Sequence, residues 1–272
     1  HCLPKTAWPS DFIAVYHGCV IQFVSNPNVF SSMTYLNLGW WSYPITIIWI
    51  VAITNAVNLI DGLDGLAVGV SAISTASITV IALMVAETNV AVVLAALFGA
   101  CLGFIPYNMN PAKIFMGDTG ATFLGYILAT LSVTGLFKMY AIISFAVPFL
   151  ILGVPIFDIC FAFLRRIAKG QNPMKADRGH VHHRLIDMGF SQKQAVAISY
   201  MLAGILGLAA VLLTSSGELK ALILIGAIFV VGAIGMRAIF GAKEPTQEQK
   251  SEQPNQPEDA SSTSQEEKHA EN

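Results

Sequence analysis

Runs of about 20 mostly apolar residues constrain this chain more than any other feature, because a helix of that length crosses the hydrocarbon core of a bilayer. Hydrophobic residues make up 54% of the sequence and charged residues only 12%, and the mean hydropathy is +0.62, which is unlike soluble proteins. The sequence therefore predicts an all-α, polytopic transmembrane helix bundle of about seven spans, with no strand pattern. The expected spans cover residues 40–60, 66–86, 90–107, 121–137, 139–164, 195–213 and 219–240.

Three regions are expected along the chain. Residues 39–240 form the transmembrane domain. Residues 1–38 contain no clean span and no secretory signal pattern, so we expect a separate extracytoplasmic segment there. Residues 241–272 lack large apolar side chains and are rich in Pro, Gln, Ser and Glu. Burial cannot offset the entropy of ordering such a segment, which predicts a disordered cytoplasmic tail.

Lys and Arg are distributed unequally between the two sides that alternating spans create. Cytoplasmic loops carry the excess of these residues, so their count predicts the orientation. One side has only Lys5, Lys138 and Lys220, which leaves most of the 15 Lys and Arg residues on the other. The cytoplasmic side of a cell membrane then receives three polar clusters, in residues 61–65, 108–120 and 165–193.

The first cluster contains Asn58, Asp61 and Asp64 at the end of the first span. Their spacing keeps them on one side of a helix end, where they can reach one ligand. Gly62 and Gly65 would let a backbone approach that ligand or would end the helix. A solvated helix end with turn-forming Asp-Gly pairs is the alternative.

The second cluster, "FMGDTG", precedes a predicted span, so Asp118 or Thr119 is expected to be the N-cap. Free amides at a helix start bind phosphate, and a carboxylate oxygen suits Mg²⁺ that bridges to phosphate. The alternative is simple capping of a membrane helix. Asn108 and Asn110 add polar groups that need partners at this depth.

The third cluster, residues 165–185, combines six Lys or Arg residues with His180, His182 and His183. A diphosphate would account for both residue types. A positive-inside patch or a contact with anionic lipid explains the cations alone, and a zinc site fits the histidine spacing poorly. Asp158, inside the fifth span, is expected either to pair with a basic residue or to line the same cavity.

Together these clusters favour a metal-dependent phosphate reaction at the cytoplasmic membrane surface. The sequence has no Walker A or GxGxxG stretch, which argues against ATP-driven chemistry and dinucleotide binding. Nothing in it predicts a nucleic-acid partner.

The segments "NAVNLIDGLDGLA", "YNMNPAKIFMGDTGATFLGY" and "PIFDICFAFLRRIAKGQNPMKADRGHVHHRL" resemble successive cytoplasmic signatures of the polyprenyl-phosphate N-acetylhexosamine-1-phosphate transferases, which include the WecA and TagO type enzymes and their relative MraY. The resemblance covers about residues 38–239. It implies transfer of a sugar 1-phosphate from a UDP-sugar to undecaprenyl phosphate, with release of UMP and a requirement for Mg²⁺, Mn²⁺ being an alternative. Members of this family tend to form dimers, so a homodimer is an expectation.

The resemblance also implies roles for individual residues. Asp118 matches the magnesium ligand, with Asn58 as a second metal-side ligand, while Asp61 and Asp64 match acidic residues of the nucleotide site. The uridine pocket corresponds to Asn108 and Phe115. The expected catalytic residues are Asp61, Asp64, Asp118, His180, His182 and His183, and the expected substrate contacts are Asn58, Asn108, Phe115, Arg178 and Arg184.

The stretch "GHVHHRL" is similar to the GlcNAc-1-phosphate branch, because Val181 separates histidines that are adjacent in the MraY branch. UDP-GlcNAc is therefore the expected donor, for a surface glycan such as teichoic acid, and the phospho-MurNAc-pentapeptide transferase reaction is the alternative. A non-catalytic transporter or scaffold is the rival from another class. The N-terminal spans of the family, with an adjacent Asp-Asp pair, have no counterpart here, so we expect an N-terminally incomplete fragment whose catalytic set is incomplete.

Overall fold

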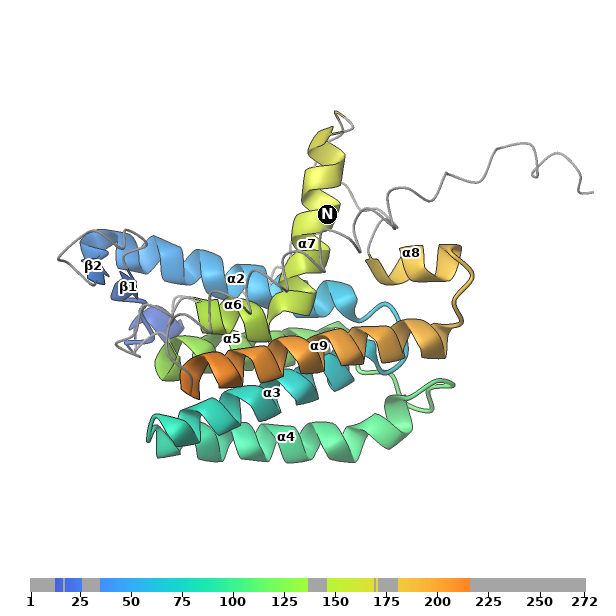
Figure 1. Cartoon of the computed structure of the whole chain (residues 1–272), viewed down its shortest axis with the longest axis horizontal. Coiled ribbons are helices and arrows are strands. Elements are labelled where there is room, and N and C mark those ends of the chain that lie inside the picture. The colour runs from blue at the N-terminus through green and yellow to red at the C-terminus, as the bar shows by residue number, and fades with distance from the viewer. Residues whose placement is uncertain are drawn as a thin grey trace, which may run out of the picture. The chain divides into compact units, whose positions relative to one another are not determined.

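The structure is a computed structural model that describes residues 13–16, 18–25, 35–136, 146–168, 170 and 181–215. Helices dominate the described residues (Figure 1). Five are long: α2 (Ser42–Ile60), α3 (Leu66–Met84), α4 (Thr88–Asn108), α5 (Gly117–Gly135) and α9 (Gln192–Ser215). The shorter elements are η1 (Gly39–Trp41), α6 (Ala146–Ile151), α7 (Gly153–Ala168), α8 (Val181–Asp187) and the strands β1 (Phe23–Ser25) and β2 (Tyr35–Asn37).

Four helical segments of the described residues are long and apolar enough to cross a membrane, namely 39–60, 66–84, 88–108 and 192–215. They coincide with four of the predicted spans and confirm the all-α membrane bundle. The span predicted at 121–137 corresponds to α5, which begins four residues earlier. The span predicted at 219–240 and the tail predicted at 241–272 lie outside the described residues.

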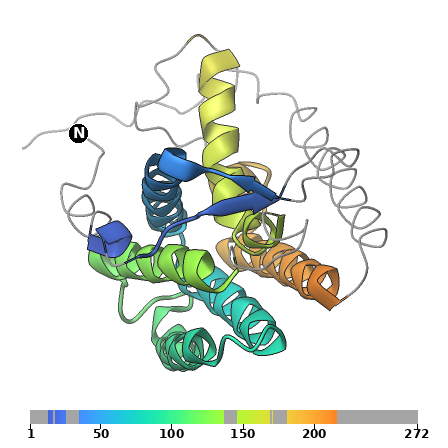
Figure 2. The same ribbon diagram turned by 90° about the vertical axis from the view of Figure 1, so that its left-hand side faces the viewer.

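The predicted span 139–164 is not one continuous helix in the part that the structure describes. α6 ends at Ile151, and α7 begins at Gly153 and runs across the direction of the long helices (Figures 1 and 2). Pro155 explains the break, because proline has no amide to donate to the carbonyl four residues earlier. That carbonyl, of Ile151, instead accepts a hydrogen bond of 3.0 Å from the Ser74 hydroxyl of α3.

α3 lies at the centre of the packing and contacts α2, α4, α5 and α9. The apolar stretch of α3 that could cross a membrane is 67% buried, which is the largest buried share among the four spans. Small residues let neighbouring helices approach closely, as membrane helices require. At Gly125 of α5, for example, an added Cβ would lie 2.8 Å from the Cα of Thr54 in α2.

A short antiparallel pair of strands precedes the bundle and was not anticipated from the sequence. β1 pairs with β2 so that Phe23 lies opposite Asn37, and the Leu38 amide donates to the Gln22 carbonyl at 3.1 Å. Each strand has only three residues, too few for the alternating pattern by which strands are recognised.

Candidate active site

The turn between α2 and α3, residues 61–65, presents Asp61 and Asp64, and we call it the acidic turn. Asp61 follows the last residue of α2, and its amide donates to the Asn58 carbonyl at 3.2 Å. Gly65 has a φ of +81° immediately before α3. Because other residues rarely adopt this left-handed conformation, glycine is needed where the chain turns into α3. The predicted helix break at the Asp-Gly pair is thus confirmed at Gly65.

Asn108 joins the acidic turn to the loop between α4 and α5, residues 108–116, which we call the asparagine loop. Its Oδ1 accepts a hydrogen bond of 3.1 Å from the Gly65 amide, and its Nδ2 donates to the Ile114 carbonyl at 3.0 Å. The side chain is 3% exposed. Asn108 therefore serves as a bridge between two segments, a role that the sequence did not suggest. Its predicted contact with uridine stays a prediction.

Asp64 is also held by the asparagine loop. Its Oδ2 accepts hydrogen bonds from Asn110 Nδ2 at 3.0 Å and from the Ala112 amide at 3.2 Å. Asn110 Nδ2 lies 2.9 Å from Gln192 Oε1 as well, at the start of α9. A chain of side chains thus connects the first residue of α9 to a carboxylate of the acidic turn.

Tyr200 of α9 contacts the acidic turn from the other side. Its hydroxyl donates to the Gly65 carbonyl, and its ring occupies the space beside Gly69, where an added Cβ would lie 2.0 Å from Cζ. Neither Tyr200 nor Gln192 was predicted. The contact joins residues 135 positions apart, and nothing in the local sequence of α9 indicates it.

Asp118 lies in the first turn of α5 and is exposed. The expectation that Asp118 or Thr119 caps this helix is wrong, because α5 already begins at Gly117 and Met116 precedes it without a side-chain cap. Gly117 has a φ of +66°, so the chain turns into the helix at the residue that tolerates this conformation. Asp118 still lies at the positive end of the helix dipole, where a carboxylate is favoured.

The three carboxylates interact electrostatically. Burial, together with the negative charges of Asp118 and Asp64, raises the pKa of Asp61 to about 6 from 3.8. Such a shift means that the charged form of Asp61 is disfavoured where the other two carboxylates are near. The arrangement concentrates negative charge that a cation would neutralise.

The donor set fits a hard divalent cation, which prefers oxygen ligands. Among the described residues, no group of three His, Cys, Asp or Glu side chains is arranged to hold a metal ion. Mg²⁺ does not need such a group, because it keeps several water ligands and usually binds one or two carboxylates together with substrate phosphates.

The predicted histidine loop is described only in part. Arg178 and His180 lie outside the described residues, while His182 and His183 belong to α8, where the structure describes their backbone. Leu185 of α8 is buried in one hydrophobic cluster with Ile60 and Leu63. The same cluster contains Ala195 and Val196 of α9, and α8 contacts α7 and α9. Since Gln192 at the start of α9 reaches Asp64 through Asn110, α8 lies at the end of the bundle that carries the acidic turn.

The structure also describes three other predicted substrate contacts, Phe115, Arg184 and Asn58. Phe115, in the asparagine loop, is 74% exposed. An exposed aromatic ring can stack on a nucleobase. Arg184 of α8 lies over the ring of Phe161 in α7, with its Cζ 5.3 Å from the ring centroid. Asn58 is partly buried in the last turn of α2.

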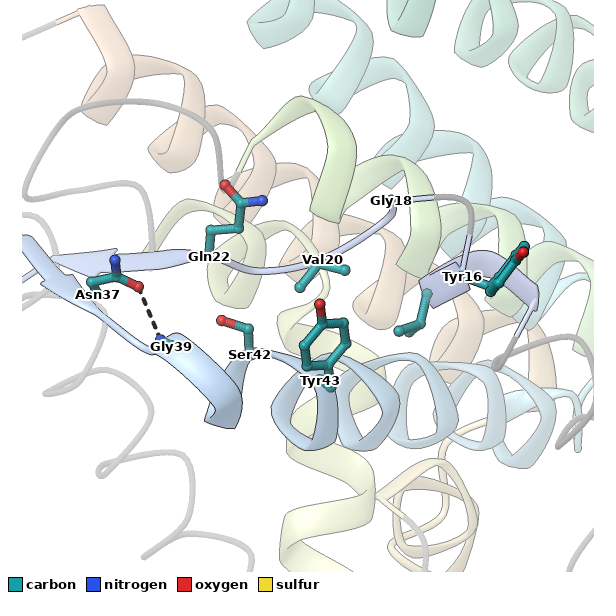
Figure 3. A pocket seen from close by; sticks show the side chains of 9 residues that line it. Tyr16, Gly18, Val20, Gln22, Asn37, Gly39, Ser42 and Tyr43 are labelled. Carbon is teal, nitrogen blue, oxygen red and sulfur yellow. Dashed lines mark hydrogen bonds between the residues drawn. The ribbon is translucent and has the colours of Figure 1, made fainter.

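A cavity of about 660 Å³ lies at the other end of α2 (Figure 3). α2 has 19 residues, so its two ends are about 28 Å apart. Tyr43 and Ser42, at the start of α2, line this cavity together with Gln22 and Asn37. None of the described residues that line it is charged, which distinguishes it from the acidic site.

Comparison with known proteins agrees with the motifs. Residues 6–136 match the sequence model of glycosyl transferase family 4. The chain is 47% identical over 179 residues to a protein of Bacillus subtilis named probable undecaprenyl-phosphate N-acetylglucosaminyl 1-phosphate transferase, which covers 66% of this chain and 50% of that protein. It is 36% identical over 188 residues to the decaprenyl-phosphate N-acetylglucosaminephosphotransferase of Mycolicibacterium smegmatis, covering 61% of this chain and 46% of that protein.

A third relative represents the other branch. The chain is 34% identical over 206 residues to the phospho-N-acetylmuramoyl-pentapeptide-transferase of Desulforudis audaxviator, with 74% of this chain and 57% of that protein covered. The chain spans about half the length of the curated relatives it matches. The matched family range begins at residue 6, and the domain boundary expected at residue 38 stays a prediction. The chain belongs to the polyprenyl-phosphate N-acetylhexosamine-1-phosphate transferase family.

Proposed function

We propose that this protein transfers GlcNAc-1-phosphate from UDP-GlcNAc to undecaprenyl phosphate and releases UMP. The observation that carries this proposal is the meeting of Asp61, Asp64 and Asp118 at the end of a membrane bundle where α8 also lies. In the net reaction, a P–O bond to the lipid phosphate forms at the phosphorus that carries the sugar. The P–O bond from that phosphorus to UMP breaks.

The chain's own residues would bind and orient the two phosphates. Phe115 would stack on uracil, and Asp61 and Asp64 would line the nucleotide site. Asp64 is preorganised for this role, because Asn110 and the Ala112 amide fix one of its oxygens. Arg184 and the histidines of the loop would contact the diphosphate and the sugar, where cations stabilise developing negative charge.

The metal proposal follows from the chemistry of the same site. Asp118 and Asn58 would hold Mg²⁺, with Mn²⁺ as a substitute, and the raised pKa of Asp61 supports the need for a cation there. The bound ion would neutralise the diphosphate and polarise its P–O bonds.

The excess of Lys and Arg in the loops on one side supports a site on the cytoplasmic face of the plasma membrane. A homodimer and a role in teichoic acid or another surface glycan belong to the same proposal. The name of the Bacillus subtilis relative and the spacing of His180 and His182 support GlcNAc over MurNAc-pentapeptide.

Release of UMP tests the proposal directly. The protein, purified in detergent, is expected to release UMP from UDP-GlcNAc only when undecaprenyl phosphate and Mg²⁺ are both present. Release with UDP-MurNAc-pentapeptide instead would assign the other branch. Absence of UMP with both donors, in protein shown to be folded, would favour a transporter or scaffold.

A further inference from the structure

The helix that carries His182 and His183 is too short to be stable alone. α8 has seven residues, whereas isolated helices shorter than about 12–15 residues are marginal. Its first amides also lack partners within the helix. Contacts from other elements must therefore determine where this helix forms and how it is held.

Asp158 of α7 provides one such contact. Its Oδ1 accepts a hydrogen bond of 2.6 Å from the backbone amide of Val181, the first residue of α8. The carboxylate is 3% exposed, and a buried charge is costly unless it is hydrogen-bonded. Negative charge at a helix start is also favoured by the helix dipole. Asp158 thus caps α8 from 23 positions earlier in the chain.

A second contact between α7 and α8 joins Phe161 to Arg184. Phe161 follows Asp158 by three residues, and Arg184 follows Val181 by three, so each pair lies on one face of its helix. The Arg184 guanidinium lies over the Phe161 ring, which is 5% exposed. Leu185 adds a third anchor, because it is buried in a hydrophobic cluster with Ala195 and Val196 of α9.

We propose that Asp158 is a positioning residue that fixes α8, and with it the backbone of His182 and His183, at the end of the bundle that carries the acidic turn. Neither of the two expectations for Asp158 included this hydrogen bond to a backbone amide, and both expectations stay predictions. The effect on catalysis rests on the proposed function, whereas the anchoring of α8 does not.

Hydrogen exchange and activity of the purified protein test the two parts separately. In Asp158→Ala, amides of residues 181–187 are expected to exchange about 10-fold faster or more, because a hydrogen bond to a charged group is lost. Exchange in α3 should not change. UMP release should fall about 100-fold, the size of effect that a small misplacement of catalytic groups produces.

Two further variants separate anchoring from general damage. Asp158→Asn keeps an oxygen acceptor, so its exchange and activity should lie between those of wild type and Asp158→Ala. Asp187→Ala removes an exposed carboxylate from the same helix and should change neither measurement.

Three outcomes decide the question. Unchanged exchange in residues 181–187 of Asp158→Ala would overturn the anchoring, and so would an equal rise in every helix. Faster exchange confined to α8 in a protein whose wild type releases no UMP would support the anchoring and overturn the transfer function.

Discussion

The acidic turn and α8 lie at the same end of the bundle but are held in different ways. The bundle itself fixes the acidic turn, through hydrogen bonds from the asparagine loop and from Tyr200 of α9. α8 is tied by Asp158 and Phe161 to α7, the helix that runs across the bundle. The comparison indicates a carboxylate side that hydrogen bonds from the bundle preorganise and a histidine side whose helix is capped from α7 and also packs on α9.

Removal of a carboxylate from the acidic side should have the largest effect on activity. Asp61→Asn is expected to lower UMP release by about 10³-fold, as loss of electrostatic transition-state stabilisation does. Its thermal stability should nevertheless rise at pH 7.5, because burial, Asp118 and Asp64 disfavour the charged form of Asp61.

The pH dependence of that stability gain checks the cause. The pKa of Asp61 is raised from 3.8 to about 6. The ionised carboxylate therefore lowers the stability of the wild type fully above about pH 6 and no longer does so below about pH 4. The melting temperatures of Asp61→Asn and wild type should therefore converge as the pH falls from 7.5 to 4. A difference in melting temperature that stays constant across this pH range would show that ionisation of Asp61 does not cause the stability gain.

Loss of the bridge at Asn108 should affect both stability and activity. Asn108→Ala leaves the buried Gly65 amide and the Ile114 carbonyl without this partner, which should cost about 2–3 kcal/mol of unfolding free energy. UMP release should fall about 100-fold as the acidic turn shifts. Asn89→Ala, at an exposed position near the start of the same helix, is the control for thermal denaturation and should behave like wild type.

The close contact between α3 and α9 offers a smaller effect on stability. Gly69→Ala would place a Cβ against the Tyr200 ring and should destabilise the protein by about 1–3 kcal/mol, as overpacking does. Gly99→Ala, in α4 with no atom within 4 Å of the added Cβ, should not. In the double variant with Tyr200→Ala, the Gly69→Ala cost should largely vanish. If the two costs simply add in thermal denaturation, the proposed contact is wrong.

The smallest effect on stability is expected at Gln192, which reaches Asp64 only through Asn110. Gln192→Ala removes one partly exposed partner of Asn110, so unfolding free energy should fall by about 1 kcal/mol or less. Lys193→Ala, at the exposed neighbouring position, is the matched control. A loss in activity as large as that of Asn108→Ala would mean that α9 positions the acidic turn more strongly than the asparagine loop does.

Much of the candidate site could be predicted from the sequence. The motifs around Asp61 and Asp118 follow or precede apolar runs, so alternating spans had to bring them to one side of the bundle. The approximate positions of α2, α3, α4 and α9 followed from the same runs. The exact start of α5 did not, because the φ of Gly117 rather than a capping side chain determines it.

The sequence by itself determined that this chain forms membrane-spanning helices and that its acidic clusters share one end, because the length and order of apolar runs leave a bilayer-embedded chain few alternatives. Only the tertiary structure decided that Asn108 and Tyr200 hold the acidic turn and that Asp158 caps α8. These hydrogen bonds join residues far apart in the chain, and each depends on the side-chain geometry of two packed elements, which local periodicity does not encode.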